Sequence, residues 1–193
     1  MRNTSLQVVP GSIQAAAQAQ GISVAEALLD AKYIVLVDSS ASMDSSDAPG
    51  NKQRFAAACA ELTKLQARLG GKVAVFSFSS ECEFAPGGVP RFLCGGTKLH
   101  KALREVVKWD GLIDSVFVLC DGWVDDEAAT MHEASRFRTT PINTVFIGPE
   151  DDMRGRDFLA RLAAANRGTT ALAEKVKELG ATIERLMLTD GAR

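Results

Sequence analysis

One apolar run, Tyr33–Val37, constrains the fold of this chain more than any other part of the sequence. Both alternating faces of the run are apolar, which is typical of a strand buried from both sides in a parallel sheet. The run stops at Asp38, and two hydroxyl side chains follow at alternate positions, Ser40 and Ser42. Because open α/β sheets bind their ligands beyond the carboxyl ends of the strands, these residues predict a polar site at the end of this strand.

Segments with the hydrophobic period of a strand and of a helix alternate along the rest of the chain. Strands that alternate with helices of about a dozen residues predict a doubly wound, Rossmann-like α/β fold, with a mostly parallel sheet of about six strands and helices on both faces. The further strands expected are Lys72–Phe78, Ser115–Cys120, Ile142–Ile147 and Thr169–Leu172, with a short antiparallel edge strand at Glu81–Phe84. The helices expected are Phe55–Leu69, Thr97–Trp109, Asp125–Arg138, Arg154–Ala165 and Glu174–Leu188.

The N-terminal stretch departs from this alternation. Residues 1–11 are expected to form a loose arm, followed by one or two short helices. Ser12–Gln20 is rich in Ala and Gln, and Ser23–Glu26 has the spacing of a capping box. We therefore expect residues 1–31 to form an arm with short helices and residues 32–193 to form one α/β domain. A partner-binding role for the arm is the alternative to a purely structural extension.

The composition argues against several classes of function. The chain of 193 residues has 22 Lys and Arg against 24 Asp and Glu, and its basic residues are scattered. We therefore expect no direct nucleic-acid binding and no attraction to an anionic membrane. No apolar run is long enough to span a membrane, and the N-terminus lacks the apolar core of a secretory signal. The four cysteines form no CxxC pair, which is typical of free thiols in a reducing cytoplasm, so we expect a cytoplasmic protein.

Two further polar segments are expected at the same edge of the sheet. Gly95-Gly96-Thr97 precedes a predicted helix, and its glycines allow a tight loop that brings the Thr97 hydroxyl inward. Asp121 ends the Ser115–Cys120 strand directly before Gly122. Taken singly, such residues most often cap a helix or tighten a turn. Taken together at three strand ends, hydroxyl and carboxylate oxygens predict a site for a hard divalent cation such as Mg²⁺.

Three motif elements in this order resemble the metal-ion-dependent adhesion site of the von Willebrand factor A-type (vWA) domains, which include the integrin I domains. The elements are Asp38-x-Ser40-x-Ser42, Thr97 and Asp121. The resemblance covers residues 33–188, the whole expected α/β body. It implies that the two serines coordinate Mg²⁺ directly, and that the threonine does so directly or through a water. It implies that the two aspartates act mainly through ordered waters and hydrogen bonds to the hydroxyls. Mn²⁺ and Ca²⁺ are the alternative ions.

The resemblance also implies a function. It suggests a non-enzymatic module that engages an Asp or Glu of a partner protein, because neutral hydroxyl ligands leave the ion attractive to an incoming carboxylate. Intracellular relatives serve as subunits or adaptors of ATPase-linked or ribonucleoprotein complexes, and the resemblance does not choose among them. Trp123 follows Asp121-Gly122 and is expected on the rim of the site as an anchor for the partner. Packing of Trp123 over the following helix is the alternative.

Two other functions are left open by the sequence. A metal-dependent hydrolase could use Asp38 and Asp121, since phosphatases of the haloacid dehalogenase type also place Asp and Mg²⁺ after a first strand. Their motif is DxD, however, and Ser40 replaces the second Asp here. The chain has no GxSxG, P-loop or GxGxxG motif, and its two histidines, His100 and His132, fall in predicted helices. The second alternative is a metal-free adaptor that binds through its N-terminal helices.

Overall fold

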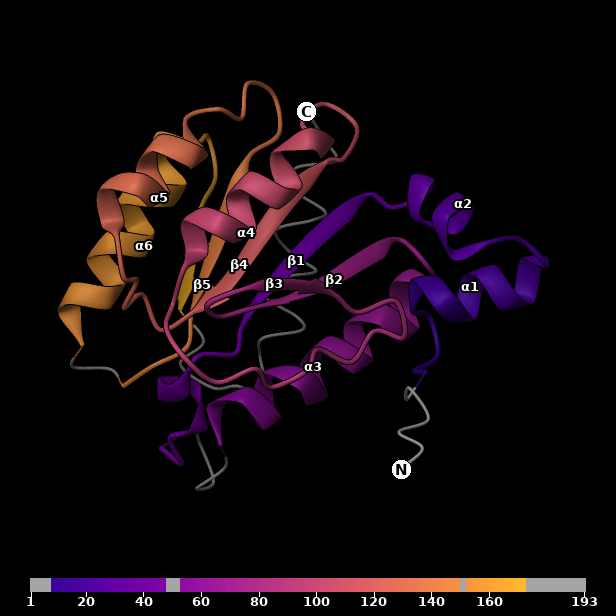
Figure 1. The fold of residues 1–193 in the computed structure, drawn as a ribbon, viewed down its shortest axis with the longest axis horizontal. Coiled ribbons are helices and arrows are strands. Elements are labelled where there is room, and N and C mark those ends of the chain that lie inside the picture. Colours follow the sequence, from indigo (N-terminus) through magenta and orange to yellow (C-terminus); the bar gives the residue numbers. More distant parts are fainter. Residues whose placement is uncertain (1–7, 48–52, 150–151, 173–193) are drawn as a thin grey trace.

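A six-stranded sheet forms the centre of the molecule (Figure 1). The computed structural model describes residues 8–47, 53–149 and 152–172 of the chain. In these ranges the strand order is β3-β2-β1-β4-β5-β6; β3 is antiparallel to β2, and all other neighbours are parallel. The predicted doubly wound, mostly parallel sheet with a short antiparallel edge strand is confirmed. The strands are β1 (Tyr33–Asp38), β2 (Val73–Phe78), β3 (Cys82–Phe84), β4 (Ser115–Cys120), β5 (Ile142–Phe146) and β6 (Thr170–Leu172).

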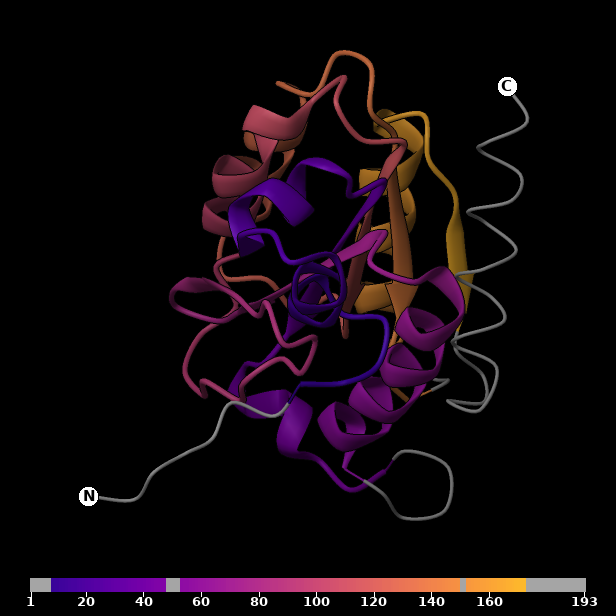
Figure 2. The same ribbon diagram turned by 90° about the vertical axis from the view of Figure 1, so that its right-hand side faces the viewer.

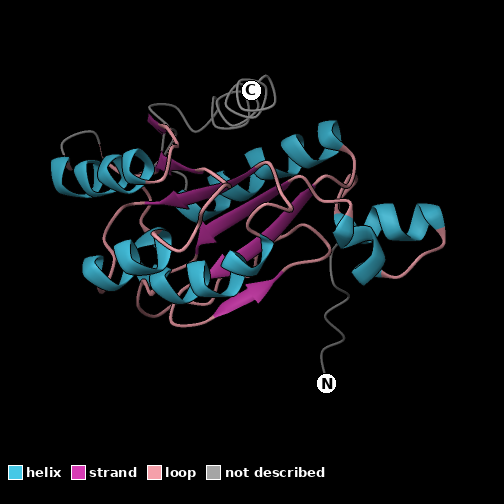
Figure 3. Ribbon diagram, turned by 90° about the horizontal axis from the view of Figure 1, so that it is seen from above, coloured by secondary structure: helices cyan, strands magenta, loops and turns pink. Residues whose placement is uncertain are grey.

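Helices cover both faces of this sheet (Figure 2 and Figure 3). Helix α3 packs on one face, and α4, α5 and α6 contribute apolar side chains to the core on the other. The two N-terminal helices lie near the amino ends of β1 and β2 (Figure 1). The helices are α1 (Ile13–Gln20), α2 (Val24–Leu29), α3 (Arg54–Leu69), α4 (Leu99–Val106), α5 (Glu127–Ala134) and α6 (Met153–Ala165), with 3-10 turns η1 (Ala41–Asp44) and η2 (Val107–Trp109).

The central strand β1 is buried on both faces. Val35 and Val37 pack in the core beneath α3, whereas Ile34 and Leu36 belong to the core on the opposite face. This division follows from the alternation of side chains along a strand. It explains why the run contains no charged residue before Asp38, which also lies in the buried interior.

Helix α5 is shorter than the sequence predicts. The hydrophobic period predicts a helix over Asp125–Arg138, but α5 begins after its N-cap Asp126, whose side chain accepts a hydrogen bond from the Ala129 N–H at 2.8 Å. The helix ends at Ala134. The Asp110 carboxylate accepts hydrogen bonds from the N–H groups of residues 138–140, which therefore turn away from the helix. The predicted helix Glu174–Leu188 lies outside the described residues.

The N-terminal segment is tied to the body of the protein. The capping box at the start of α2 is confirmed: Ser23 Oγ accepts from the Glu26 N–H at 3.2 Å, and Glu26 Oε2 accepts from the Ser23 N–H at 2.8 Å. The described part of the arm is not loose, since Val9 is buried and its N–H donates to Gly87 O at 3.0 Å. The division of the chain into residues 1–31 and 32–193 stays a prediction. Within the described ranges, no helix has the length and apolarity needed to cross a membrane.

Candidate metal centre

The strand order brings the ends of β1 and β4 together at a switch point of the sheet. The chain leaves β1 towards β2 on one side, and β4 pairs with β1 on the other side. Crossover connections therefore diverge between β1 and β4, and the carboxyl ends of such a strand pair are where open α/β sheets bind ligands. Asp38 is the last residue of β1, and Asp121 follows the last residue of β4. The fold therefore places the two carboxylates side by side.

Asp38 is fully buried, and both of its carboxylate oxygens accept hydrogen bonds. Oδ1 accepts from the Ser40 N–H at 2.8 Å, and Oδ2 accepts from the Cys120 thiol at 2.9 Å. The hydroxyl oxygens of Ser40 and Ser42 lie 3.1 Å apart. Ser40 is the N-cap of η1 but makes no side-chain capping hydrogen bond. These serine hydroxyls are thus paired with each other beside the carboxylate, and the Ser40 hydroxyl does not serve as a cap.

Thr97 is buried in a loop that contacts both strand ends. Its N–H donates to Asp125 Oδ1 at 3.0 Å, and its carbonyl oxygen accepts from the Asp125 N–H at 3.1 Å, which joins it to the loop after β4. Two residues earlier, Gly95 O accepts from the Ala41 N–H at 3.1 Å, which joins the same loop to the end of β1. The N-cap of α4 is Lys98, so Thr97 does not cap that helix.

Asp121 is buried and held by groups on both sides. Oδ1 accepts a hydrogen bond from the Trp123 N–H at 3.1 Å, which closes a turn. The other oxygen, Oδ2, lies 3.4 Å from Nη1 of Arg54. Gly122, between Asp121 and Trp123, has a φ of 80°, and a Cβ there would lie 2.2 Å from the carbonyl oxygen of Gly155 in α6. Only glycine satisfies both requirements, so the Asp-Gly pair sets the position of the carboxylate.

The electrostatics of this cluster favour a cation. One ligand atom from each of Asp38, Cys120 and Asp121 lies within 4.8 Å of the other two. Burial raises the pKa of Asp38 to about 6; the hydrogen bond from Cys120 opposes this rise, and the charge of Asp121 adds to it. Two buried carboxylates beside two hydroxyls match the hard oxygen ligands of Mg²⁺ and related ions. The residues present therefore fit the predicted ion.

Comparison with solved structures identifies the fold. No protein-family model matches the sequence, and no curated protein matches it either. Three solved structures superpose well. The conserved hypothetical protein BatB from Bacteroides thetaiotaomicron has a TM-score of 0.62 and 14% identity, and the match covers 84% of this chain and 100% of that chain. A von Willebrand factor type A protein from Catenulispora acidiphila has a TM-score of 0.61 and 16% identity, with 83% of this chain and 42% of that chain covered; the manganese-loaded TRAP protein of Plasmodium vivax has a TM-score of 0.60 and 14% identity, with 83% and 74% of the two chains covered. The protein has the vWA fold. At these identities the likeness concerns the fold alone, and it confirms the vWA fold that the motifs suggested.

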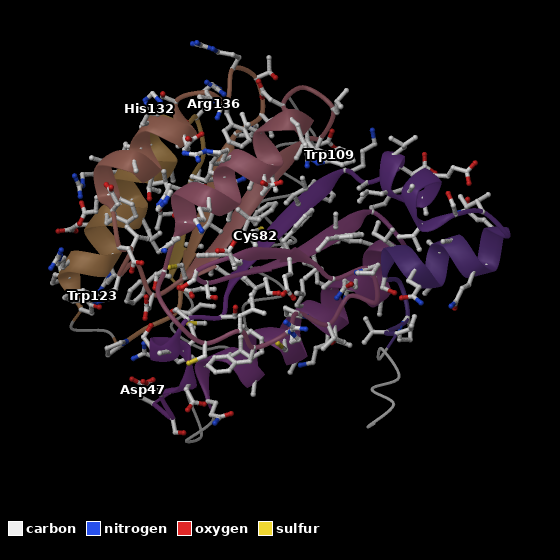
Figure 4. All side chains as sticks on the ribbon, in the orientation of Figure 1. Asp47, Cys82, Trp109, Trp123, His132 and Arg136 are labelled. Atoms are coloured by element: carbon white, nitrogen blue, oxygen red, sulfur yellow. The ribbon has the colours of Figure 1, made fainter. Side chains whose placement is uncertain are left out.

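On this vWA fold, Trp123 is tied to the cluster by the hydrogen bond from its N–H to Asp121. Its side chain is held by the start of α6, and Figure 4 labels its position. Its indole N–H donates to the carboxylate of Asp152, and the guanidinium carbon of Arg154 lies 4.6 Å from its ring centre. The side chain is still 48% exposed. Asp152 is also the N-cap of α6 and accepts from the Gly155 N–H at 3.1 Å. Trp123 therefore contacts the start of α6 through Asp152 and Arg154.

Two residues beside the site were missed by the sequence analysis. Cys120 has the sequence context of a small buried hydrophobe, but its thiol donates to Asp38, and burial raises the pKa of this thiol well above its usual value. Its place directly before Asp121 was the available signal. Arg54 is the first residue of α3 and is only 8% exposed. A basic residue in the first turn opposes the helix dipole, which indicates a nearby anionic partner.

Neither histidine belongs to the described cluster of Asp38, Cys120 and Asp121. His132 is exposed near the carboxyl end of α5, away from Trp123 (Figure 4). His100 lies in α4. Among the described residues, the group of protonatable side chains that could hold an ion contains two aspartates and a cysteine and no histidine.

Proposed function

We propose that this protein is a non-enzymatic binding module that engages an acidic group of a partner protein through a divalent cation. One observation carries the proposal: the carboxylates of Asp38 and Asp121 are buried close to each other at the switch point of a vWA fold, and the paired hydroxyls of Ser40 and Ser42 follow Asp38. Burying two carboxylates side by side is costly unless a cation compensates them. An ion that remains accessible to a partner's carboxylate would supply both the compensation and the function.

The hydroxyl residues and the aspartates of the site would have different roles. Ser40, Ser42 and Thr97 would hold the ion through their hydroxyl oxygens. Asp38 and Asp121 would hold ion-bound waters and hydroxyls in place, since the oxygens of Asp38 already accept hydrogen bonds from fixed donors. When bound, the ion supplies positive charge and an exchangeable coordination position. Mg²⁺ is the ion we propose; Mn²⁺ and Ca²⁺ are alternatives, and the TRAP structure is described as manganese-loaded.

The rim of the site suggests where a partner would gain affinity beyond its carboxylate. Trp123 and Met153 are 48% and 59% exposed, and Arg154 covers one face of the indole ring. Arg154 also lines an open hollow over α5 and α6, together with Glu127, Met153, Asp157, Ala160 and Arg161. We propose that apolar residues next to the partner's acidic residue pack on Trp123, because exposed tryptophans are enriched at binding hot spots. An ATPase-linked or ribonucleoprotein complex as the source of this partner stays a prediction.

The hydrolase alternative has less support. The site combines carboxylates with hydroxyls, and no histidine belongs to the described cluster of ion-holding groups, where it could act as a general base. The thiol of Cys120 has a pKa well above its usual value because of burial, so it stays protonated and is a poor nucleophile. We therefore expect no turnover of phosphoesters or esters above the level of the Asp38→Ala variant.

Calorimetric titration with MgCl₂ and MnCl₂ tests the metal site directly. We expect saturable binding of one ion per chain, lost in Ser40→Ala and in Asp121→Ala. Asp44→Ala is the matched control, because Asp44 lies in η1, close to Ser42 in sequence, but is exposed and accepts from Gln53 at 2.8 Å. Equal heats for the wild type and for folded Ser40→Ala would contradict the proposal, as would loss of binding in the control.

Selection of displayed random peptides tests the partner chemistry. Peptides are bound to the immobilised protein in Mg²⁺ and released with a chelator. We expect the released peptides to share an Asp or Glu, and we expect synthetic versions with Asn or Gln at this position to lose binding. Trp123→Ala should weaken the same peptides without changing metal affinity. Chelator-resistant binding that survives Ser40→Ala but depends on the N-terminal helices would instead support the metal-free adaptor.

A further inference from the structure

A buried arginine bridges the metal cluster and a surface loop. Nη1 of Arg54 lies 3.4 Å from Asp121 Oδ2, while Nε lies 2.6 Å from Asp47 Oδ1 and Nη2 contacts the other oxygen of Asp47. Arg54 is 8% exposed, whereas the Asp47 side chain is 44% exposed. Asp47 follows η1, the turn that carries Ser42, so one guanidinium links the segment after β1 to Asp121 at the end of β4.

The two contacts of this guanidinium are unequal. The contact with Asp47 is short and uses two nitrogens, which is the strong bidentate geometry for an arginine and a carboxylate. The contact with Asp121 is a single, longer one. Asp47 therefore anchors Arg54, and Asp121 is its weaker second partner.

The helix dipole and burial both disfavour an arginine at position 54. A cation in the first turn of α3 faces the positive end of the helix dipole, and burial adds a desolvation cost. The carboxylates of Asp47 and Asp121, which the guanidinium contacts, offset both costs. A divalent cation held beside Asp121 would be repelled by this guanidinium, and it would compete with it for the same carboxylate.

We propose that Arg54 lowers the affinity of the site for divalent cations by competing for Asp121, and that Asp47 controls how strongly Arg54 competes. This inference rests on the metal site proposed above. With Asp47 present, the Arg54 guanidinium stays paired with the Asp47 carboxylate when the ion binds beside Asp121. Without Asp47, Asp121 is the one of these two carboxylates that is left to pair with Arg54, and the ion must displace the guanidinium from Asp121. The pair thus tunes the metal affinity of this chain from outside the set of hydroxyl ligands.

The proposal predicts opposite effects for the two partners. Arg54→Gln, which removes the charge but keeps hydrogen-bonding groups, should bind Mn²⁺ and Mg²⁺ about tenfold more tightly than the wild type. Asp47→Asn should bind the ions several-fold more weakly. In the double variant Arg54→Gln/Asp47→Asn, the tighter binding of Arg54→Gln should be nearly retained, because Asp47 acts chiefly through Arg54. Such non-additivity identifies a coupled pair.

Calorimetric titration of the full chain with MnCl₂ measures all four combinations, and circular dichroism checks that each variant is folded. Arg54→Met replaces Arg54→Gln if the latter does not fold. Arg91→Gln is the matched control, since Arg91 forms an exposed pair with Glu83 at 2.9 Å. Equal or weaker binding by Arg54→Gln would overturn the inference, and so would an Asp47→Asn effect of the same size in both backgrounds. If neither the wild type nor Arg54→Gln binds an ion at millimolar concentration, the metal site itself is wrong; if the wild type binds and Arg54→Gln binds equally, only the role of Arg54 is wrong.

Discussion

At the scale of single residues, Asp38 has the most unusual environment in the candidate site. It is fully buried, and its two hydrogen-bond donors, the Ser40 N–H and the Cys120 thiol, are both neutral. Burial raises the pKa of Asp38 from its ordinary value of 3.8 to about 6. The folded protein therefore binds this proton more tightly than the unfolded chain. In the absence of metal, stability falls as the pH rises through the interval from about 4 to about 6.

Metal affinity should show the opposite dependence on pH. Because the ion binds the site with Asp38 ionised, it must displace a proton below about pH 6, and the affinity should fall by up to about tenfold for each pH unit below this value. Above about pH 7 Asp38 is ionised, and its titration should no longer change the metal affinity. Calorimetric titration with MgCl₂ across this range measures the dependence. An affinity that is the same at acidic and neutral pH would show that Asp38 does not couple to the ion.

Cys120 should act by positioning Asp38. In Cys120→Val the Asp38 Oδ2 loses its donor, and we expect weaker metal binding together with a loss of about 1–3 kcal/mol in the free energy of unfolding. Cys120→Ser restores a donor and should recover the metal affinity, although its buried hydroxyl does not fill the volume of the thiol. Urea denaturation and metal titration measure the two effects. Cys59→Val, in α3, is the control thiol; equal behaviour of the two valine variants would contradict a positioning role.

At the scale of elements, the close approach of α6 to the loop after β4 fixes one side of the site. A Cβ on Gly155 would lie 2.2 Å from the carbonyl oxygen of Asp121, and a Cβ on Gly122 would lie 2.2 Å from the carbonyl oxygen of Gly155. The start of α6 also holds the indole of Trp123 through Asp152. The helix and the loop therefore form one unit, which carries both the carboxylate of Asp121 and the exposed tryptophan.

This packing predicts that two glycines with positive φ will differ in their tolerance of alanine. Gly122→Ala should lower the free energy of unfolding by more than about 2 kcal/mol and abolish metal binding, because the new methyl group pushes α6 away from Asp121. Gly21→Ala, at the end of α1, should cost only the backbone strain of about 1 kcal/mol and leave metal binding intact, since a Cβ on Gly21 would have no atom within 4 Å. Thermal unfolding and metal titration compare the two variants. Equal losses would show that the contact with Gly155 does not matter.

At the scale of the whole molecule, the candidate site joins parts of the chain that are far apart in sequence. Asp38 and Cys120 are separated by 82 positions, and Arg54 and Asp121 by 67. An ion that contacts the ends of β1 and β4 and the loop before α4 therefore binds only the folded domain. Binding of this kind stabilises the whole native state by mass action.

Metal ions should accordingly raise the melting temperature. At a concentration about one hundred times the dissociation constant, the stabilisation is about 2.7 kcal/mol, or roughly 5–10 °C for a domain of this size. Thermal unfolding in MgCl₂, MnCl₂, CaCl₂ and chelator measures the shift and ranks the ions. Ser40→Ala should show no shift, and Asp44→Ala should behave as the wild type. A melting temperature that is unchanged by any of these ions would contradict the metal site.

Several local features of the structure were predictable from the sequence. Ser115–Cys120 was predicted to the residue because its apolar run ends abruptly at Asp121-Gly122. The capping box of α2 was recognised because it depends on residues three positions apart. The end of α5 was not, because the carboxylate that binds residues 138–140 comes from Asp110, beyond any local window. The metal-binding roles of Ser40, Ser42, Thr97 and Asp121 stay predictions, although the structure brings both serines and the two aspartates to one edge.

By itself, the sequence determined the fold class and the edge of the sheet at which a polar site would form. Hydrophobic period and abrupt strand ends are local properties, and parallel strands bring their carboxyl ends to one side. Only the tertiary structure decided which groups surround the carboxylates. The thiol of Cys120 on Asp38 and the guanidinium of Arg54 on Asp121 are contacts between distant segments. No local pattern encodes such contacts, because they depend on how strands and helices pack together.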